Sequence, residues 1–177
     1  MNRCFARLIL ITVFTGWSLN AHEISTLIEE SKPSYNEVKN NILKSAEWMP
    51  EENYAFRPTP GSRTFGQLIG DVARSQADVC SAIAGDRSQV NGAYSTSKAD
   101  LVAALKESIR KCDSAYGSVN TFNAGQEVGF GSMRHSKLAL LFLNAAHDND
   151  LYGQLATYLR LKGFLPPSAQ ARVVPID

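Results

Sequence analysis

The stretch "AHDNDLYGQLATYLRLKGFLPP", residues 146–167, decides how the C-terminal part of this chain folds. Glycine favours the C-terminal cap of a helix and proline cannot continue one, so Gly163 and the two prolines after it end a long helix. We expect this helix to run from about Ser132 to Lys162. It carries His147 without a histidine four residues later, the spacing at which two imidazoles on one helical face converge on a metal ion.

Working outward, three earlier segments begin with a hydroxyl residue followed three positions later by an acid or an amide, which is typical of a capping box. The pairs are Ser34 with Glu37, Thr64 with Gln67, and Ser97 with Asp100. Each pair opens a stripe of apolar residues at helical spacing. No stretch alternates long enough to predict a sheet, although the sequence is compatible with a brief extended segment at residues 127–131. Four amphipathic helices predict an all-α four-helix bundle.

The connection between the second and third helices, residues 85–96, is long enough to run back along a whole helix. About a dozen residues at roughly 3.3 Å each match the length of a helix of about 20 residues that rises about 1.5 Å per residue. The two helices can therefore run parallel, with this connection as a crossover.

Residues 1–21 are typical of a secretory signal peptide. Two arginines precede the apolar run at residues 8–14, and small and polar residues follow it, so we expect cleavage after Ala21. The alternative is an uncleaved anchor, although this run is shorter than the about 20 apolar residues that a bilayer of about 30 Å requires. The mature domain, residues 22–177, would then be periplasmic or secreted, with no stable membrane insertion after cleavage.

The composition is that of one globular domain. Of 177 residues, 44% are hydrophobic and 20% are charged. Cleavage would remove Arg3 and Arg7 from the 18 basic residues, leaving 16 against 17 acidic residues. We find no basic patch, and we therefore expect no binding to nucleic acid.

Three motifs resemble the DinB-like family, specifically its exported bacterial members. They are "MPEENYAFRPTP" at 49–60, "RTFGQLIGDVA" at 63–73, and the segment at 143–167. The similarity covers about residues 34–167. It implies a four-helix bundle of up-down-down-up topology, in which the second and third helices run parallel.

Many members of this family hold a divalent metal with three histidines, and the resemblance places those positions on Asp71, His147 and Leu151. A carboxylate can bind a divalent metal, but leucine offers no donor, so the metal triad is degenerate. We expect no bound cofactor, with zinc, nickel or manganese as the alternative. If Asp71 and His147 are instead a structural pair, they should be in contact across the second and fourth helices.

Parallel second and third helices would place Cys80 and Cys112 at one level, about 24 Å and 22 Å from the starts of their helices. An exported protein meets an oxidising compartment, and a disulfide needs Cα atoms within about 7 Å. We therefore expect a Cys80–Cys112 disulfide. Two buried thiols are the alternative.

Two functions follow from the resemblance. The first is a non-catalytic, exported helical bundle that binds a small ligand or a protein partner, alone or as a homodimer. The alternative is a divalent-metal-dependent transferase or hydrolase that uses an altered site of Asp71 and His147, with the metal as a Lewis acid. No serine lies in a recognisable hydrolase motif, so no catalytic residue is assigned. Arg57 and Arg63 are either anion contacts at a pocket mouth or solvated loop residues.

Overall fold

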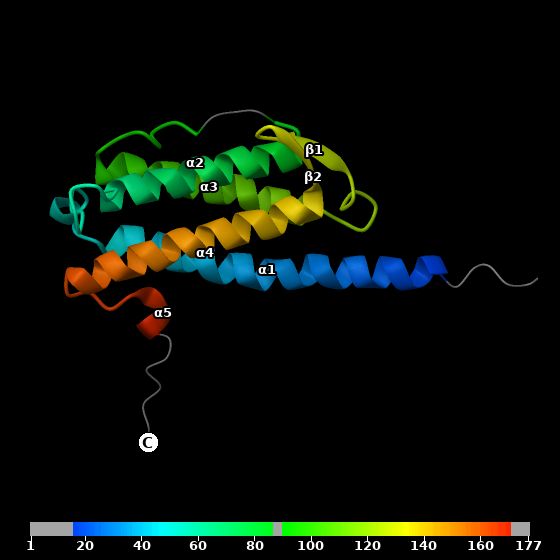
Figure 1. Cartoon of the computed structure of the whole chain (residues 1–177), viewed down its shortest axis with the longest axis horizontal. Coiled ribbons are helices and arrows are strands. Elements are labelled where there is room, and N and C mark those ends of the chain that lie inside the picture. Colours follow the sequence, from blue (N-terminus) through cyan, green and yellow to red (C-terminus); the bar gives the residue numbers. More distant parts are fainter. Residues whose placement is uncertain (1–15, 87–89, 171–177) are drawn as a thin grey trace, which may run out of the picture.

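A computed structural model describes residues 16–86 and 90–170, which form an all-α four-helix bundle with one short hairpin (Figure 1). The long helices are α1 (Gly16–Trp48), α2 (Phe65–Ala84), α3 (Lys98–Ser118) and α4 (Lys137–Leu161). The short elements are η1 (Glu51–Asn53), β1 (Glu127–Phe130), β2 (Met133–Ser136) and α5 (Pro167–Gln170). The predicted fold class is confirmed.

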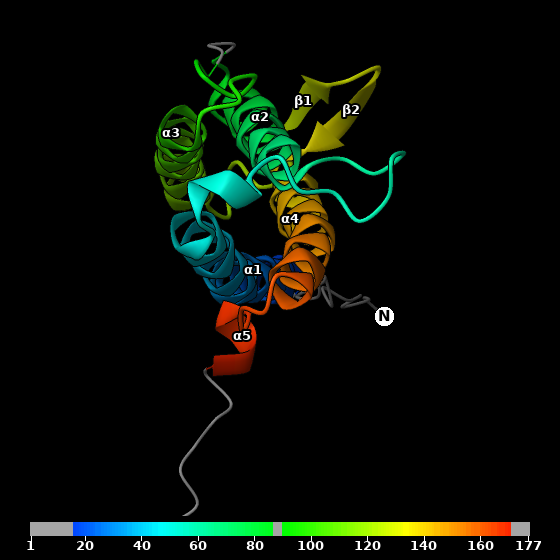
Figure 2. The ribbon, with the colours of Figure 1, turned by 90° about the vertical axis from the view of Figure 1, so that its left-hand side faces the viewer.

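The helices surround the core in the order α1, α3, α2, α4, as the view along the bundle shows (Figure 2). Helices α2 and α3 run parallel, and residues 90–97 of the α2–α3 connection lie along α2 on their way back to the start of α3 (Figure 1). The up-down-down-up topology with a long crossover is therefore confirmed. It explains why α2 and α3, adjacent in sequence, begin at the same end of the bundle.

The predicted caps at Thr64 and Ser97 are confirmed. The Thr64 hydroxyl accepts from the Gln67 N–H at 3.1 Å, and the Thr64 N–H donates to Gln67 Oε1 at 2.7 Å, so the capping box is complete. Ser97 caps α3 by accepting from the Asp100 N–H at 3.4 Å.

The predicted starts of the first and fourth helices are wrong. Helix α4 begins only at Lys137, because residues 133–136 pair with residues 127–130 in an antiparallel hairpin. Helix α1 begins far before Ser34 and continues through Pro33. Ile28 and Tyr35 are buried on either side of that proline, and this packing outweighs the about 3 kcal/mol that a proline costs inside a helix.

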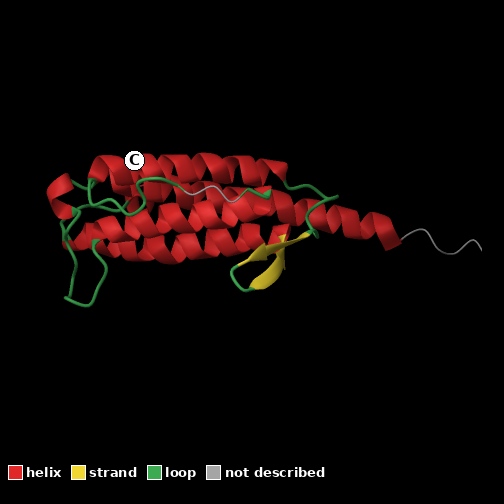
Figure 3. Ribbon diagram, turned by 90° about the horizontal axis from the view of Figure 1, so that it is seen from above, coloured by secondary structure: helices red, strands yellow, loops and turns green. Residues whose placement is uncertain are grey.

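The expected signal peptide falls only partly within the described residues. Residues 1–15 lie outside them, and residues 16–21 belong to α1. Figure 3 shows that this first part of α1 projects beyond the other helices. Among the described residues, none of the helices combines the length and the apolar character needed to cross a membrane.

Two clusters of buried apolar side chains fill the bundle, one toward each end. The helical segments that follow Ser34, Thr64 and Ser97 supply most of them. Cys80 and Cys112 lie in the second cluster and form the predicted disulfide, with their Cα atoms 5.1 Å apart. The bridge joins α2 to α3 at the level that parallel helices predict.

Candidate functional site

Asp71 lies on the first half of α2, and its side chain is only 19% exposed. Its Oδ2 accepts a hydrogen bond from Arg63 Nη1 at 2.7 Å, and its Oδ1 accepts one from Arg74 Nη2. Both carboxylate oxygens are therefore bonded to guanidinium groups. The hydrogen bond to Asp71 raises the pKa of Arg74, a guanidinium that is charged at every physiological pH.

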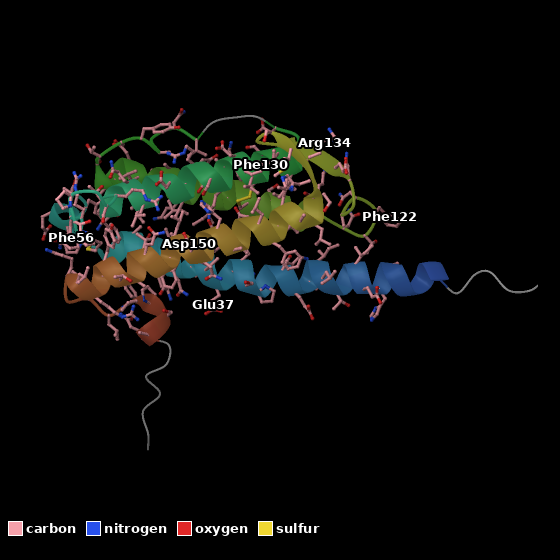
Figure 4. All side chains as sticks on the ribbon, viewed as in Figure 1. Glu37, Phe56, Phe122, Phe130, Arg134 and Asp150 are labelled. Atoms are coloured by element: carbon pink, nitrogen blue, oxygen red, sulfur yellow. A yellow bond between two sulfur atoms is a disulfide. The ribbon has the colours of Figure 1, made fainter. Side chains whose placement is uncertain are left out.

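Arg63 also connects the start of α2 to α4. Its Nη2 donates to Gln154 Oε1 at 3.0 Å, and its backbone carbonyl accepts from the Tyr158 hydroxyl at 2.7 Å. Gln154 in turn donates to Asp150, which Figure 4 labels on α4. Arg63 is thus a structural link between two helices rather than a freely solvated loop residue.

His147 does not meet Asp71. It is exposed on α4, and its side chain makes no hydrogen bond or ion pair with any residue of the described chain, so the predicted contact between Asp71 and His147 is wrong. The reason is the orientation of α4. Each helical residue turns by about 100°, and it is the next residue, Asp148, that faces the core.

A cavity of about 300 Å³ lies beside Asp71, between the first half of α2 and residues 93–96 of the α2–α3 connection. Its charged wall consists of Arg63, Asp71 and Arg74. We call this cavity the Arg74–Tyr94 pocket, because Arg74 lines it from α2 and Tyr94 lines it from the connection. The Tyr94 side chain is 77% exposed, and the Arg74 guanidinium lies 5.3 Å from the centre of its ring.

Gly70 is the reason that Tyr94 reaches this position. A Cβ atom at residue 70 would lie 2.3 Å from the backbone oxygen of Ala93, so only glycine lets the connection touch α2 here. Neither Arg74 nor Tyr94 was predicted from the sequence as a site residue. A glycine in the interior of an otherwise strong helix was the available signal, because such a residue often marks the close approach of another segment.

A cluster of polar side chains is buried inside the bundle around Asp148. Its Oδ2 accepts from Gln76 Nε2 on α2 at 2.8 Å and from Asn144 Nδ2 at 3.2 Å. Ser108 on α3 donates to Gln76 Oε1 at 2.8 Å. Within residues 16–86 and 90–170, Asp148 Oδ1 has no hydrogen-bond partner. Burial raises the pKa of Asp148 to about 7, although the two amide hydrogen bonds partly counteract this effect.

This cluster was not predicted from the sequence either, although Asn144 and Asp148 lie four residues apart on one helical face. Their positions fall among the buried leucines of α4, at residues 140, 151 and 155. Asp148 is fully buried, so the cluster has no access for a substrate and acts on stability.

Comparison with known families agrees with this architecture. The sequence profile of the DinB superfamily matches residues 34–155. This chain belongs to the DinB superfamily. No curated protein matches it.

Two solved structures show the DinB-superfamily fold of this chain. It is similar to a DinB-like protein from Bacillus cereus, with 15% identity and a TM-score of 0.68, over 78% of this chain and 95% of that one. It is also similar to a DinB-like protein from Bacillus subtilis, with 18% identity and a TM-score of 0.61, over 76% of this chain and 92% of that one.

The residues at the implied metal position of this DinB-superfamily chain do not fit a divalent ion. Asp71 uses both oxygens on arginines, and the aliphatic side chain of Leu151 is buried in the core. Within residues 16–86 and 90–170, no three His, Cys, Asp or Glu side chains gather closely enough to hold a metal. The arrangement instead presents two guanidinium groups beside a small cavity.

Proposed function

We propose that this chain is an exported DinB-superfamily protein with a degenerate metal triad, which acts by binding a small ligand or a protein partner. The observation that carries this proposal is the pairing of Asp71 with Arg63 and Arg74. A divalent ion at Asp71 would have to displace two charged hydrogen bonds, which are among the strongest in proteins. It would also approach two fixed positive charges.

Export is supported by two features of the chain. The order of basic, apolar and small residues over residues 1–21 is that of a signal peptide. The Cys80–Cys112 disulfide suits an oxidising compartment, such as the periplasm or the exterior of the cell.

Metal analysis of tag-free protein tests the proposal. We expect well under one zinc, nickel or manganese ion per chain, both after purification and after dialysis against each metal. Stoichiometric metal that is lost in Asp71→Ala or His147→Ala would contradict the proposal and favour the metal-dependent transferase or hydrolase. Asp78→Ala is the matched control, because Asp78 is an exposed carboxylate on the same helix. Sedimentation velocity on the same sample tests whether the chain acts alone or as a homodimer.

A further inference from the structure

We propose that the Arg74–Tyr94 pocket binds a small organic anion that carries a planar apolar group, such as an aromatic carboxylate. This inference rests on the proposed function, because it requires that Asp71 be held by arginines and not by a metal. The ligand's carboxylate would bind Arg74, and its planar group would pack against the Tyr94 ring.

Arg74 supplies N–H donors to the pocket that can bind a carboxylate. A guanidinium group has five N–H donors in a planar fork. Within the described chain, Arg74 directs Nη2 to Asp71 and meets Tyr94 both over its ring and through a side-chain hydrogen bond, so these two partners do not use all five donors. The Arg74 side chain is 36% exposed and lines the pocket, so an entering carboxylate can reach the remaining donors.

The charged side chains that line the pocket favour an anion. The pocket wall carries two arginines and one aspartate, which leaves one positive charge in excess. Two further acids lie outside the wall: Asp150 accepts from Gln154, and Asp100 accepts from the pocket-lining Ser95. The pocket therefore attracts an anion and repels a cation.

The size and shape of the pocket suit a small planar ligand. A volume of about 300 Å³ is at the lower end of the range for small-molecule sites and suits a single ring with a short acidic group. The Tyr94 side chain is 77% exposed, and the Arg74 guanidinium lies over one face of its ring. Planar groups pack favourably against such a ring, and a carboxylate fits the fork of an arginine.

The backbone that carries Tyr94 is held in position by contacts within the protein. The carbonyl of Ala93 touches α2 at Gly70, and Ser95 donates a hydrogen bond to Asp100 at 2.9 Å. The Ser95 N–H donates to the Gly92 carbonyl at 3.0 Å. The backbone is thus held on both sides of Tyr94, which lowers the entropic cost of binding.

The test is a titration of ¹⁵N-labelled full chain with benzoate, followed by NMR in EDTA and again with added zinc. Benzamide is the neutral control ligand, and acetate is the control without a ring. We expect saturable shifts of the signals of Gly66, Gly70 and Tyr94 in EDTA. We also expect dissociation constants at least about tenfold larger for both control ligands. Each control ligand lacks one good contact, and the loss of such a contact lowers affinity about tenfold.

Three variants complete the experiment. Arg74→Gln and Tyr94→Ala should each weaken benzoate binding at least about tenfold, with unchanged thermal unfolding as the check on folding. Arg110→Gln should have no effect, because Arg110 forms the same kind of i,i+3 ion pair, with Glu107, on another helix.

The outcomes separate the two proposals. Binding of benzoate only after zinc is added would overturn the proposed function. If benzoate produces no saturable shift in either condition, if benzamide binds equally well, or if Arg74→Gln has no effect, this inference is overturned while the proposed function stands.

Discussion

At the scale of single residues, Asp148 links stability to pH. Its pKa is raised by burial from 3.8 to about 7, and the groups that face it are neutral: the amides of Gln76 and Asn144, and the phenols of Tyr35 and Tyr116. Between about pH 4 and pH 7 the folded chain therefore keeps a proton that the unfolded chain loses. The contribution of Asp148 to stability is complete below pH 4 and is lost as the pH rises through 7, a change of about 4 kcal/mol.

We expect Asp148→Asn to remove this loss. The variant should be more stable than the natural chain at pH 8 by a few kcal/mol, and the difference should shrink toward pH 4. Urea unfolding at intervals from pH 4 to pH 8 measures it. Asp78→Asn, at an exposed site, is the control. Parallel stability curves for the natural chain and Asp148→Asn would show that Asp148 titrates normally in the folded state.

At the scale of elements, the contact between α2 and residues 90–97 depends on Gly70. A methyl group at residue 70 would meet the Ala93 oxygen at 2.3 Å, and one of the two segments would have to move. We expect Gly70→Ala to lower the free energy of unfolding by about 1–3 kcal/mol and to weaken benzoate binding by displacing Tyr94.

Gly153 on α4 provides the matched control. A Cβ atom there meets nothing within 4 Å, so Gly153→Ala should raise the free energy of unfolding by about 0.5–1 kcal/mol through its helix propensity alone. Chemical denaturation of both variants checks the pair. Equal effects of the two substitutions would mean that the connection does not press on α2.

At the scale of the whole molecule, the Cys80–Cys112 bridge closes a loop with a sequence separation of 32. The loop includes the long crossover, so the bridge restricts the unfolded chain in the segment that must travel farthest. We expect Cys80→Ala with Cys112→Ala to cost about 3–4 kcal/mol of stability in the chain-entropy model. Thermal and urea unfolding of this variant should match those of the reduced natural chain. A reduced chain as stable as the oxidised one would contradict the prediction.

Much of the architecture could be predicted from the sequence because it depends on local interactions. The caps at Thr64 and Ser97, and the end of α4 before Gly163, involve residues within about four positions of one another. The apolar stripes follow from helical periodicity in the same way. The disulfide additionally required the parallel arrangement, which the family resemblance supplied.

The candidate site was predicted less well. The sequence identifies the position of Asp71 but not its two arginine partners, and it does not indicate that Asp148 is the buried aspartate. Two hydrogen bonds depend on the tertiary structure alone. Gln76 donates to Asp148 over a sequence separation of 72 residues, and Arg63 donates to Gln154 over a separation of 91 residues. A shift of one residue around α4 exchanges a buried position for an exposed one, and that rotation is set by packing against the other helices. The sequence by itself determined four amphipathic helices and their ends. Packing determined which charges lie inside, because burial is a property of all the elements together.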